Sequence, residues 1–266
     1  MGEYAVNLAE FEGGLSTDPR MRIDEPVWNL PAVLAFPESP SLLIKATDEG
    51  RDAGVRVVRN IMLRMFTSFP PGKVRFTIID PTGLGQNFSE FMHLADFDER
   101  LVSSRIWTES NHIQQRLADL TEHMENVIQK YLRNEFESIQ DYNKAAGEIA
   151  EPFQVLVIAN FPANCSEESA RRLISIVSTG ARCGVYTLIV ADTRMTPPRN
   201  FDLADLEANS NTLVWQDGRL AWQNERLNHF SLQLDTTAEG AQLTEAVRAA
   251  GEHAKDANRV EVPFGA

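Results

Sequence analysis

Short apolar runs alternate with amphipathic stretches along most of the chain. Runs rich in β-branched residues predict strands at residues 41–44, 73–80, 101–108, 153–158 and 184–191. Apolar residues spaced three and four positions apart predict helices at residues 51–68, 110–131 and 166–180, the last two capped by Ser110 and Ser166. Strands that are buried on both faces have continuous apolar sequences. The pattern therefore predicts an α/β fold with a mainly parallel central sheet and helices on both faces.

The C-terminal part of the chain has a different pattern. Apolar runs at residues 212–215 and 220–222 flank Asp217-Gly218, a dipeptide that strongly favours a two-residue hairpin turn. A further strand is predicted at residues 230–234, followed by a helix to Ala254. We expect these elements to form an antiparallel edge on the same sheet, because mixed sheets often carry one.

The N-terminal segment has weak periodicity. Residues 1–30 mix charged residues, glycines and Pro19, and we interpret them as a lead-in segment. The stretch from Pro31 to Pro40 is expected to be a linker or an edge strand, because proline cannot donate a hydrogen bond in a central strand. Residues 31–266 are predicted to be a single domain, with a core at 38–198 and a C-terminal hairpin and helix at 199–266.

Composition narrows the class of protein. The 266 residues, 43% of them hydrophobic, suffice for one large α/β domain or two small ones. A net charge of −13 makes a poor surface for nucleic acid, whose phosphates are bound mainly by Lys and Arg. With only two cysteines, Cys165 and Cys183, no disulfide framework is expected. No apolar run of about 18 residues and no secretory signal is visible, so we expect a cytoplasmic protein without a membrane segment.

Residues 42–52 combine a short strand, a loop and the start of a helix, the setting in which a phosphate-binding P-loop occurs. The P-loop motif is G-x-x-x-x-G-K-[ST]. Here Lys45 replaces the first glycine, Arg51 replaces the lysine, and Asp52 replaces the hydroxyl that binds magnesium, while Gly50 is retained. The strand, loop and helix therefore predict the fold in which P-loops occur, whereas the loop residues argue against the nucleotide hydrolysis that is usual for that fold.

The charges of this loop also oppose phosphate binding. Asp48, Glu49 and Asp52 would place three carboxylates beside a polyphosphate. At roughly 4–6 Å and an effective dielectric constant of about 20, each unit repulsion is on the order of 3–4 kcal/mol. Lys45 and Arg51 would offset part of this repulsion. We interpret the loop as degenerate and free of nucleotide, with weak nucleotide binding or true ATPase activity as the alternatives.

Taken together, the segments resemble the FtsK/SpoIIIE family of RecA-like hexameric ATPase motors over roughly residues 31–198. The closest resemblance is to the tandem kind, which includes the EccC-like motors of type VII secretion. The matching pieces, in chain order, are the strand ending in Asp80-Pro81, the helix from Met124 to Tyr131 with the following Tyr142-Asn143, the turn Gly180 to Val185, and the strand from Leu188 to Arg194. The resemblance implies a RecA-like P-loop NTPase fold.

The second catalytic element departs from the family pattern. Active members follow the strand at residues 155–158 with Asp-Glu, which hold magnesium and polarise the attacking water; this chain has Ala159-Asn160. Alanine offers no side-chain oxygen, and Asn160 can orient a water but cannot take its proton. Thr193 stands where the family usually has glutamine. The departures imply that catalysis has been lost.

The resemblance implies a catalytically inactive module of a larger translocase, acting as a structural, docking or regulatory domain beside an active ATPase domain. Its expected partners are other ATPase domains of the same chain or ring, without direct nucleic-acid binding. An active or weakly active DNA translocase, and a regulator that binds nucleotide without hydrolysis, are the alternatives. No cofactor is expected, ATP with magnesium being the alternative. The residues of a remnant nucleotide pocket would be Thr47, Gly50, Arg51, Asp52, Asp80 and Asn160.

Overall fold

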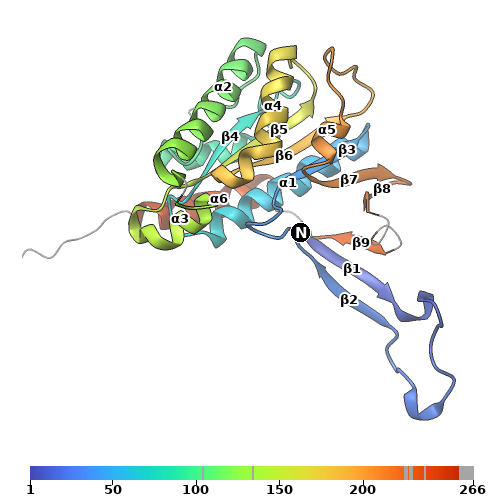
Figure 1. The fold of residues 1–266 in the computed structure, drawn as a ribbon. Helices are drawn as coiled ribbons and strands as arrows, with labels where there is room; N and C mark the ends of the chain where they lie inside the picture. The colour runs from blue at the N-terminus through green and yellow to red at the C-terminus, as the bar shows by residue number, and fades with distance from the viewer. Residues whose placement is uncertain (104, 134, 225–226, 228–229, 237, 258–266) are drawn as a thin grey trace, which may run out of the picture.

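A six-stranded sheet forms the centre of the molecule (Figure 1). The computed structural model describes residues 1–103, 105–133, 135–224, 227, 230–236 and 238–257. Five consecutive strands of this sheet run parallel to one another, and the sixth, at one edge, pairs antiparallel with the strand beside it. The sheet order is β4 (Val74–Ile79), β5 (Phe153–Phe161), β6 (Val185–Asp192), β3 (Leu42–Ala46), β7 (Asn211–Gln216) and β8 (Arg219–Trp222). The predicted α/β fold with an antiparallel hairpin at its edge is confirmed.

Helices cover both faces of this sheet, because side chains of successive strand residues point to opposite sides. Leu42 and Ile44 of β3 belong to one core cluster, and Leu43 belongs to the other. The first cluster includes helices α1 (Glu49–Ser68) and α6 (Gly240–Ala257) and the 3₁₀ segment η3 (Gln86–Asp96). The second includes α2 (Ser110–Val127), α3 (Ile139–Ala146), α4 (Glu167–Thr179) and α5 (Ala204–Glu207). Among the described residues, no helix is long and apolar enough to cross a membrane.

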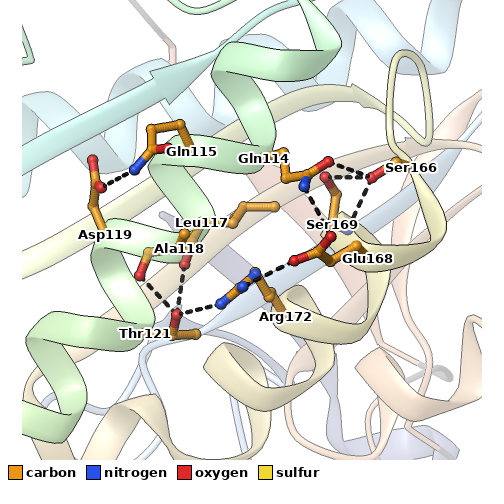
Figure 2. A network of polar contacts seen from close by, with 10 residues as sticks. All are labelled: Gln114, Gln115, Leu117, Ala118, Asp119, Thr121, Ser166, Glu168, Ser169 and Arg172. Carbon is orange, nitrogen blue, oxygen red and sulfur yellow. Dashed lines mark hydrogen bonds and ion pairs between the residues drawn. The ribbon is translucent and has the colours of Figure 1, made fainter.

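Helices α2 and α4 are joined by polar contacts above their apolar packing (Figure 2). The amide of Gln114 donates to Glu168 over 2.9 Å, and Arg172 donates both to Thr121 (3.1 Å) and to Glu168 (2.9 Å). These contacts link one helix to the next across 51 and 54 residues of sequence. The two helices are therefore joined by polar as well as apolar contacts on one face of the sheet.

The two predicted serine caps have different outcomes. Ser166 caps α4 as expected, its hydroxyl accepting from the backbone N–H of Ser169 over 3.1 Å. Ser110 does not cap α2, because it is the first residue of the helix and the cap position belongs to Glu109, whose side chain makes no capping hydrogen bond. Serine is common both at the cap position and in the first turn of a helix. Its presence alone therefore could not locate the start of α2 to within one residue.

The N-terminal segment forms part of a second sheet, in the antiparallel order β2 (Val27–Ala32), β1 (Gly2–Asn7) and β9 (Ser231–Leu234). The boundary predicted between residues 30 and 31 falls inside β2. Pro31 does lie on an edge strand. The expectation that the strand at residues 230–234 joins the main sheet was wrong, because β9 pairs with β1 from the other end of the chain.

Strand β2 and the loop that joins it to β1 extend away from the main sheet (Figure 1). We call residues 8–33 of this projection the arm. It carries large apolar side chains that are 45–67% exposed, namely Phe11, Met21, Val27, Trp28, Leu30 and Val33. Tyr4 and Val6 of β1 are buried against the core and anchor its base.

The strand predicted at residues 101–108 is only partly realised. The segment lies along β4 and pairs with it in isolated parallel bridges, Phe76 with Val102 and Ile79 with Trp107. Leu101, Val102 and Trp107 are buried, which explains the apolar pattern.

Candidate functional site at the carboxyl edge of the sheet

The carboxyl ends of β3, β4, β5 and β6 meet at one edge of the sheet, where α/β folds place their ligands. Asp80 directly follows β4, Asn160 lies near the end of β5, and Asp192 ends β6. The amide of Asn160 donates to Asp80 over 3.3 Å, and both side chains are buried. The structure therefore brings Asp80 and Asn160 together, at the edge where the sequence placed them.

The turn between β3 and α1 is very short. β3 runs to Ala46 and α1 begins at Glu49, so only Thr47 and Asp48 connect them. The N–H of Gly50 donates to the carbonyl of Thr47 (2.9 Å), and the N–H of Arg51 donates to the carbonyl of Asp48 (3.0 Å). In a P-loop such N–H groups face the phosphates. Here these two donors are already used inside the turn.

Gly50 is retained for a packing reason. It is buried, and a Cβ atom at this position would lie 2.3 Å from Cγ of Trp215 on β7. Trp215 in turn packs against the first core cluster. The indole ring thus lies against the start of α1, so Gly50 makes room for this side chain.

Arg51 is held by a carboxylate that the sequence did not point to. Its NH1 lies 3.2 Å from Oδ2 of Asp192 and donates more weakly to Oδ1 of Asn160 over 3.4 Å. The Asp192 side chain is 5% exposed and that of Arg51 is 30% exposed. Arg51, expected to offset the loop carboxylates, is thus paired with an acid that comes from β6 and not from the loop. Asp192 is the last residue of a strong apolar strand, and that position was its only mark in the sequence.

Asp192 also binds Arg194, which extends the network to the loop. Burial alone would raise the pKa of Asp192, yet hydrogen bonds from the backbone (3.0 Å) and the Nε (3.3 Å) of Arg194, with the charge of Arg51, hold this pKa below its usual range. NH1 of Arg194 contacts the carboxylate of Asp48, a residue with a left-handed φ of 45°. The same contacts raise the pKa of Arg194. Paired charges therefore run from β6 to the turn.

Three loop side chains lie outside this network. Lys45, expected to offset the loop carboxylates, instead forms an ion pair with Glu207 of α5 over 2.7 Å, because its position inside β3 directs it to a neighbouring element. Asp52 is exposed on the first turn of α1, and Thr47 contributes its backbone carbonyl. Neither side chain joins the contacts between Arg51, Asn160 and Asp192.

Asp80 is fully buried and is surrounded by donors. Its carboxylate accepts from the backbone N–H groups of Gly83 and Asn87 (3.3 Å each), from the side-chain amide of Asn87 (3.1 Å) and from Asn160. It therefore organises the turn after β4. Among the described residues, no group of three or more His, Cys, Asp and Glu side chains could hold a metal ion.

Comparisons with known proteins agree with this architecture. The sequence model of the FtsK/SpoIIIE family matches residues 46–208. No curated protein matches the sequence. Among solved structures, EssC (ATPases 2 and 3) from Geobacillus thermodenitrificans has 14% identity and a TM-score of 0.61, covering 96% of this chain and 49% of that chain.

Two other solved structures are also similar in fold at low sequence identity. Thermomonospora curvata EccC (ATPases 2 and 3), in complex with a signal sequence peptide, has 14% identity and a TM-score of 0.59, covering 96% of this chain and 50% of that chain. The pCW3 conjugation coupling protein TcpA has 11% identity and a TM-score of 0.51, covering 79% and 60%. The chain thus spans about half the length of the EssC and EccC structures.

Proposed function

The chain belongs to the FtsK/SpoIIIE family, and we propose that it is an ATPase-like module of a larger translocase that neither binds nor hydrolyses ATP. The observation that carries this proposal is the contact between Arg51 and Asp192 over 3.2 Å. Arg51 occupies the place of the lysine that holds phosphates in a working P-loop. Its guanidinium is bound to the protein's own carboxylate instead.

Releasing Arg51 to a nucleotide would be costly. Breaking a buried ion pair by removing one partner costs about 3–5 kcal/mol, and less here because Arg51 is 30% exposed. An incoming triphosphate would also meet Glu49 and Asp52 without compensation from Lys45, which is paired with Glu207, whereas the charge of Asp48 is paired with Arg194. The local charges therefore favour the closed ion pair over an open nucleotide pocket.

The groups needed for hydrolysis are likewise occupied or missing. Ala159 is fully buried and has no side-chain oxygen. The amide of Asn160 is shared between Asp80 and Arg51. The carboxylate of Asp80 already receives four hydrogen bonds. The carboxylate and amide that end β4 and β5 are therefore already engaged within the protein, which supports the loss of catalysis.

We infer that the partner of this module is another ATPase domain of the same chain or ring. The EssC and EccC structures carry two ATPase domains, and this chain covers 49% and 50% of them. The exposed apolar side chains of the arm are of the kind that mark protein–protein contacts. A net charge of −13 disfavours a second copy of this chain and favours a more basic neighbour. A cytoplasmic location is part of the same proposal, since the cytoplasmic domain of EssC has the same fold at 14% identity.

Calorimetry with ATP and magnesium, combined with phosphate release, tests the proposal. We expect neither a saturable heat nor turnover above the rate without protein. Micromolar binding with turnover that Arg51→Ala abolishes would instead establish an active motor domain. Saturable binding without phosphate release would establish a nucleotide-sensing regulator, the second alternative.

A further inference from the structure

An apolar cavity of about 240 Å³ lies at the carboxyl ends of β5 and β6, beside the network around Arg51. Its lining includes Phe161 and Phe201, two buried aromatic residues whose ring centroids lie 5.2 Å apart. It also includes Met195 and Pro197, exposed residues of the loop that follows β6. Because buried rings and exposed loop side chains share one lining, the cavity connects the core to the surface.

The size and lining of the cavity suit one aromatic side chain. A volume of about 240 Å³ is below the range of about 300–1,000 Å³ for small-molecule sites. Aromatic rings pack well against other rings in offset or edge-to-face arrangements. Methionine is flexible, and its sulfur makes favourable contacts with rings. Phe161, Phe201 and Met195 therefore offer contacts that a single ring from outside can use.

Two carboxylates line the cavity, and one of them is already balanced. Asp192 pairs with Arg51 and with Arg194, and Arg194 also contacts Asp48. These side chains carry equal positive and negative charge. Asp192 therefore adds no net charge to the cavity walls, and the second carboxylate decides which charge a ligand can carry.

The second carboxylate, that of Asp202, has no ion-pair partner among the described residues. It is exposed, and it accepts a hydrogen bond from the backbone N–H of Ala204 over 2.9 Å. No Lys, Arg or His of the described residues lines the cavity, and Arg199 of the same loop lies outside the lining. The unbalanced charge of the walls is therefore negative, so a cation beside the ring is favoured over an anion.

We propose that this cavity receives an aromatic side chain of a protein partner, with a neighbouring Lys or Arg of that partner beside Asp202. The net charge of −13 favours a partner of this basic kind. The inference rests on the proposed function only in taking the partner to be another ATPase domain of the same chain or ring. The docking of a ring in the cavity rests on the lining alone.

A titration of the 266-residue chain with capped dipeptides tests the docking. The probes are Phe-Lys, Phe-Glu and Gly-Lys, each acetylated and amidated, at constant ionic strength. NMR spectra of the 7 methionine methyl groups report binding, and the Met195 signal is the one that Met195→Leu removes. We expect Phe-Lys to shift this signal with a Kd of roughly 1–10 mM, Phe-Glu to bind about threefold to tenfold more weakly, and Gly-Lys not to bind.

Variants of exposed residues locate the contacts. Asp202→Asn should reduce the preference for Phe-Lys over Phe-Glu to less than about twofold. Asp205→Asn is its matched control and should leave the preference unchanged, because it removes the same charge from an exposed residue outside the lining. Met195→Ala should weaken the binding of Phe-Lys about threefold or more, and Met195→Leu should weaken it less, because leucine keeps the apolar volume. Backbone amide signals report binding in these two variants.

Three results would overturn the proposal. The first is no saturable shift of the Met195 signal up to about 50 mM Phe-Lys. The second is equal affinity for Phe-Lys and Phe-Glu, or equal effects of Asp202→Asn and Asp205→Asn on the preference. The third is a Met195 signal that shifts with protein concentration alone, which would assign the cavity to a second copy of this chain. None of these results depends on ATP, so the titration with ATP and magnesium tests the proposed loss of nucleotide binding separately.

Discussion

Arg51 can pair with a phosphate oxygen or with a carboxylate, and Asp192 supplies the carboxylate within 3.2 Å. Arginine suits this role because its fork stays charged and bonds two acceptors at once. Asp192 is 5% exposed, so an uncompensated charge there would be unfavourable. The pair therefore stabilises this edge of the sheet, whether or not a nucleotide binds beside it.

Replacing Asp192 by Asn tests this structural role. The change leaves Arg51 and Arg194 without the carboxylate that both contact. Hydrogen bonds to charged groups contribute about 1.5–3 kcal/mol each, so we expect the free energy of unfolding to fall by about 1–3 kcal/mol. Urea unfolding followed by circular dichroism measures it. Asp52→Asn, at an exposed position outside the network, is the control and should change stability by less than about 0.5 kcal/mol. Equal effects of the two variants would contradict the role of Asp192.

The same residue gives a prediction for pH. The pKa of Asp192 is held below its usual range, so the folded state favours the ionised carboxylate. Its stabilisation is then complete above the unfolded pKa of about 3.9 and is lost as the pH falls below that value through the folded pKa. The stability difference between the wild type and Asp192→Asn should be constant from pH 5 to 6 and should shrink between about pH 4 and pH 2.5. A difference that grew on acidification would have the wrong sign.

At the level of elements, the turn between β3 and α1 is shaped by Trp215 of β7. In the P-loop motif, the four residues between the two glycines belong to the phosphate-binding loop. Here Lys45, in the place of the first glycine, lies inside β3, and Gly50 lies inside α1. The hairpin of β7 and β8 carries the indole onto this junction, and Asp217 and Gly218 close it with φ values of 53° and 75°. One edge hairpin thus fixes how the helix starts.

Gly50→Ala separates packing from phosphate binding. Alanine favours helices by up to about 1 kcal/mol over glycine, so an unobstructed site would be stabilised. Here the new methyl group would meet Trp215 at 2.3 Å, and we expect a net loss of about 1–3 kcal/mol from overpacking. Thermal unfolding of Gly50→Ala, Trp215→Leu and the double variant forms a mutant cycle. The second substitution should recover part of the loss. Strict additivity would mean that the two residues do not interact.

The same elements show how far the sequence could lead. The strands β3 to β6 and the Asp217-Gly218 turn were predictable, because burial on both faces and positive φ values leave local marks. The pairing of β9 with β1 was not, since a short strand's pattern does not name a partner at the other end of the chain. Asp192 was missed for the same reason. Its function depends on strand order, which places β6 between β3 and β5, and no local spacing encodes that order.

On the scale of the whole molecule, charge limits what the domain can bind. The 25 Lys and Arg residues are outnumbered by 38 Asp and Glu residues, giving −13. Several of these cations are used internally, as Arg51, Lys45 and Arg59 are in ion pairs. A molecule with this balance repels phosphate backbones and attracts basic protein surfaces. The exposed apolar residues of the arm then suit a protein partner better than a nucleic acid.

DNA binding provides the last test, because motors that move DNA must hold its backbone. We expect no saturable change in fluorescence anisotropy of a labelled duplex of about 20 base pairs at low micromolar protein and 50 mM salt, since affinity comes from contacts with phosphates, which a net charge of −13 disfavours. A titration at 200 mM salt distinguishes charge-driven binding, which would fall steeply with salt, from contacts through the arm, which would not. Tight binding that weakens in this way would mean that the formal charge hides a basic track, and the domain would then belong among the DNA-handling parts of its parent motor.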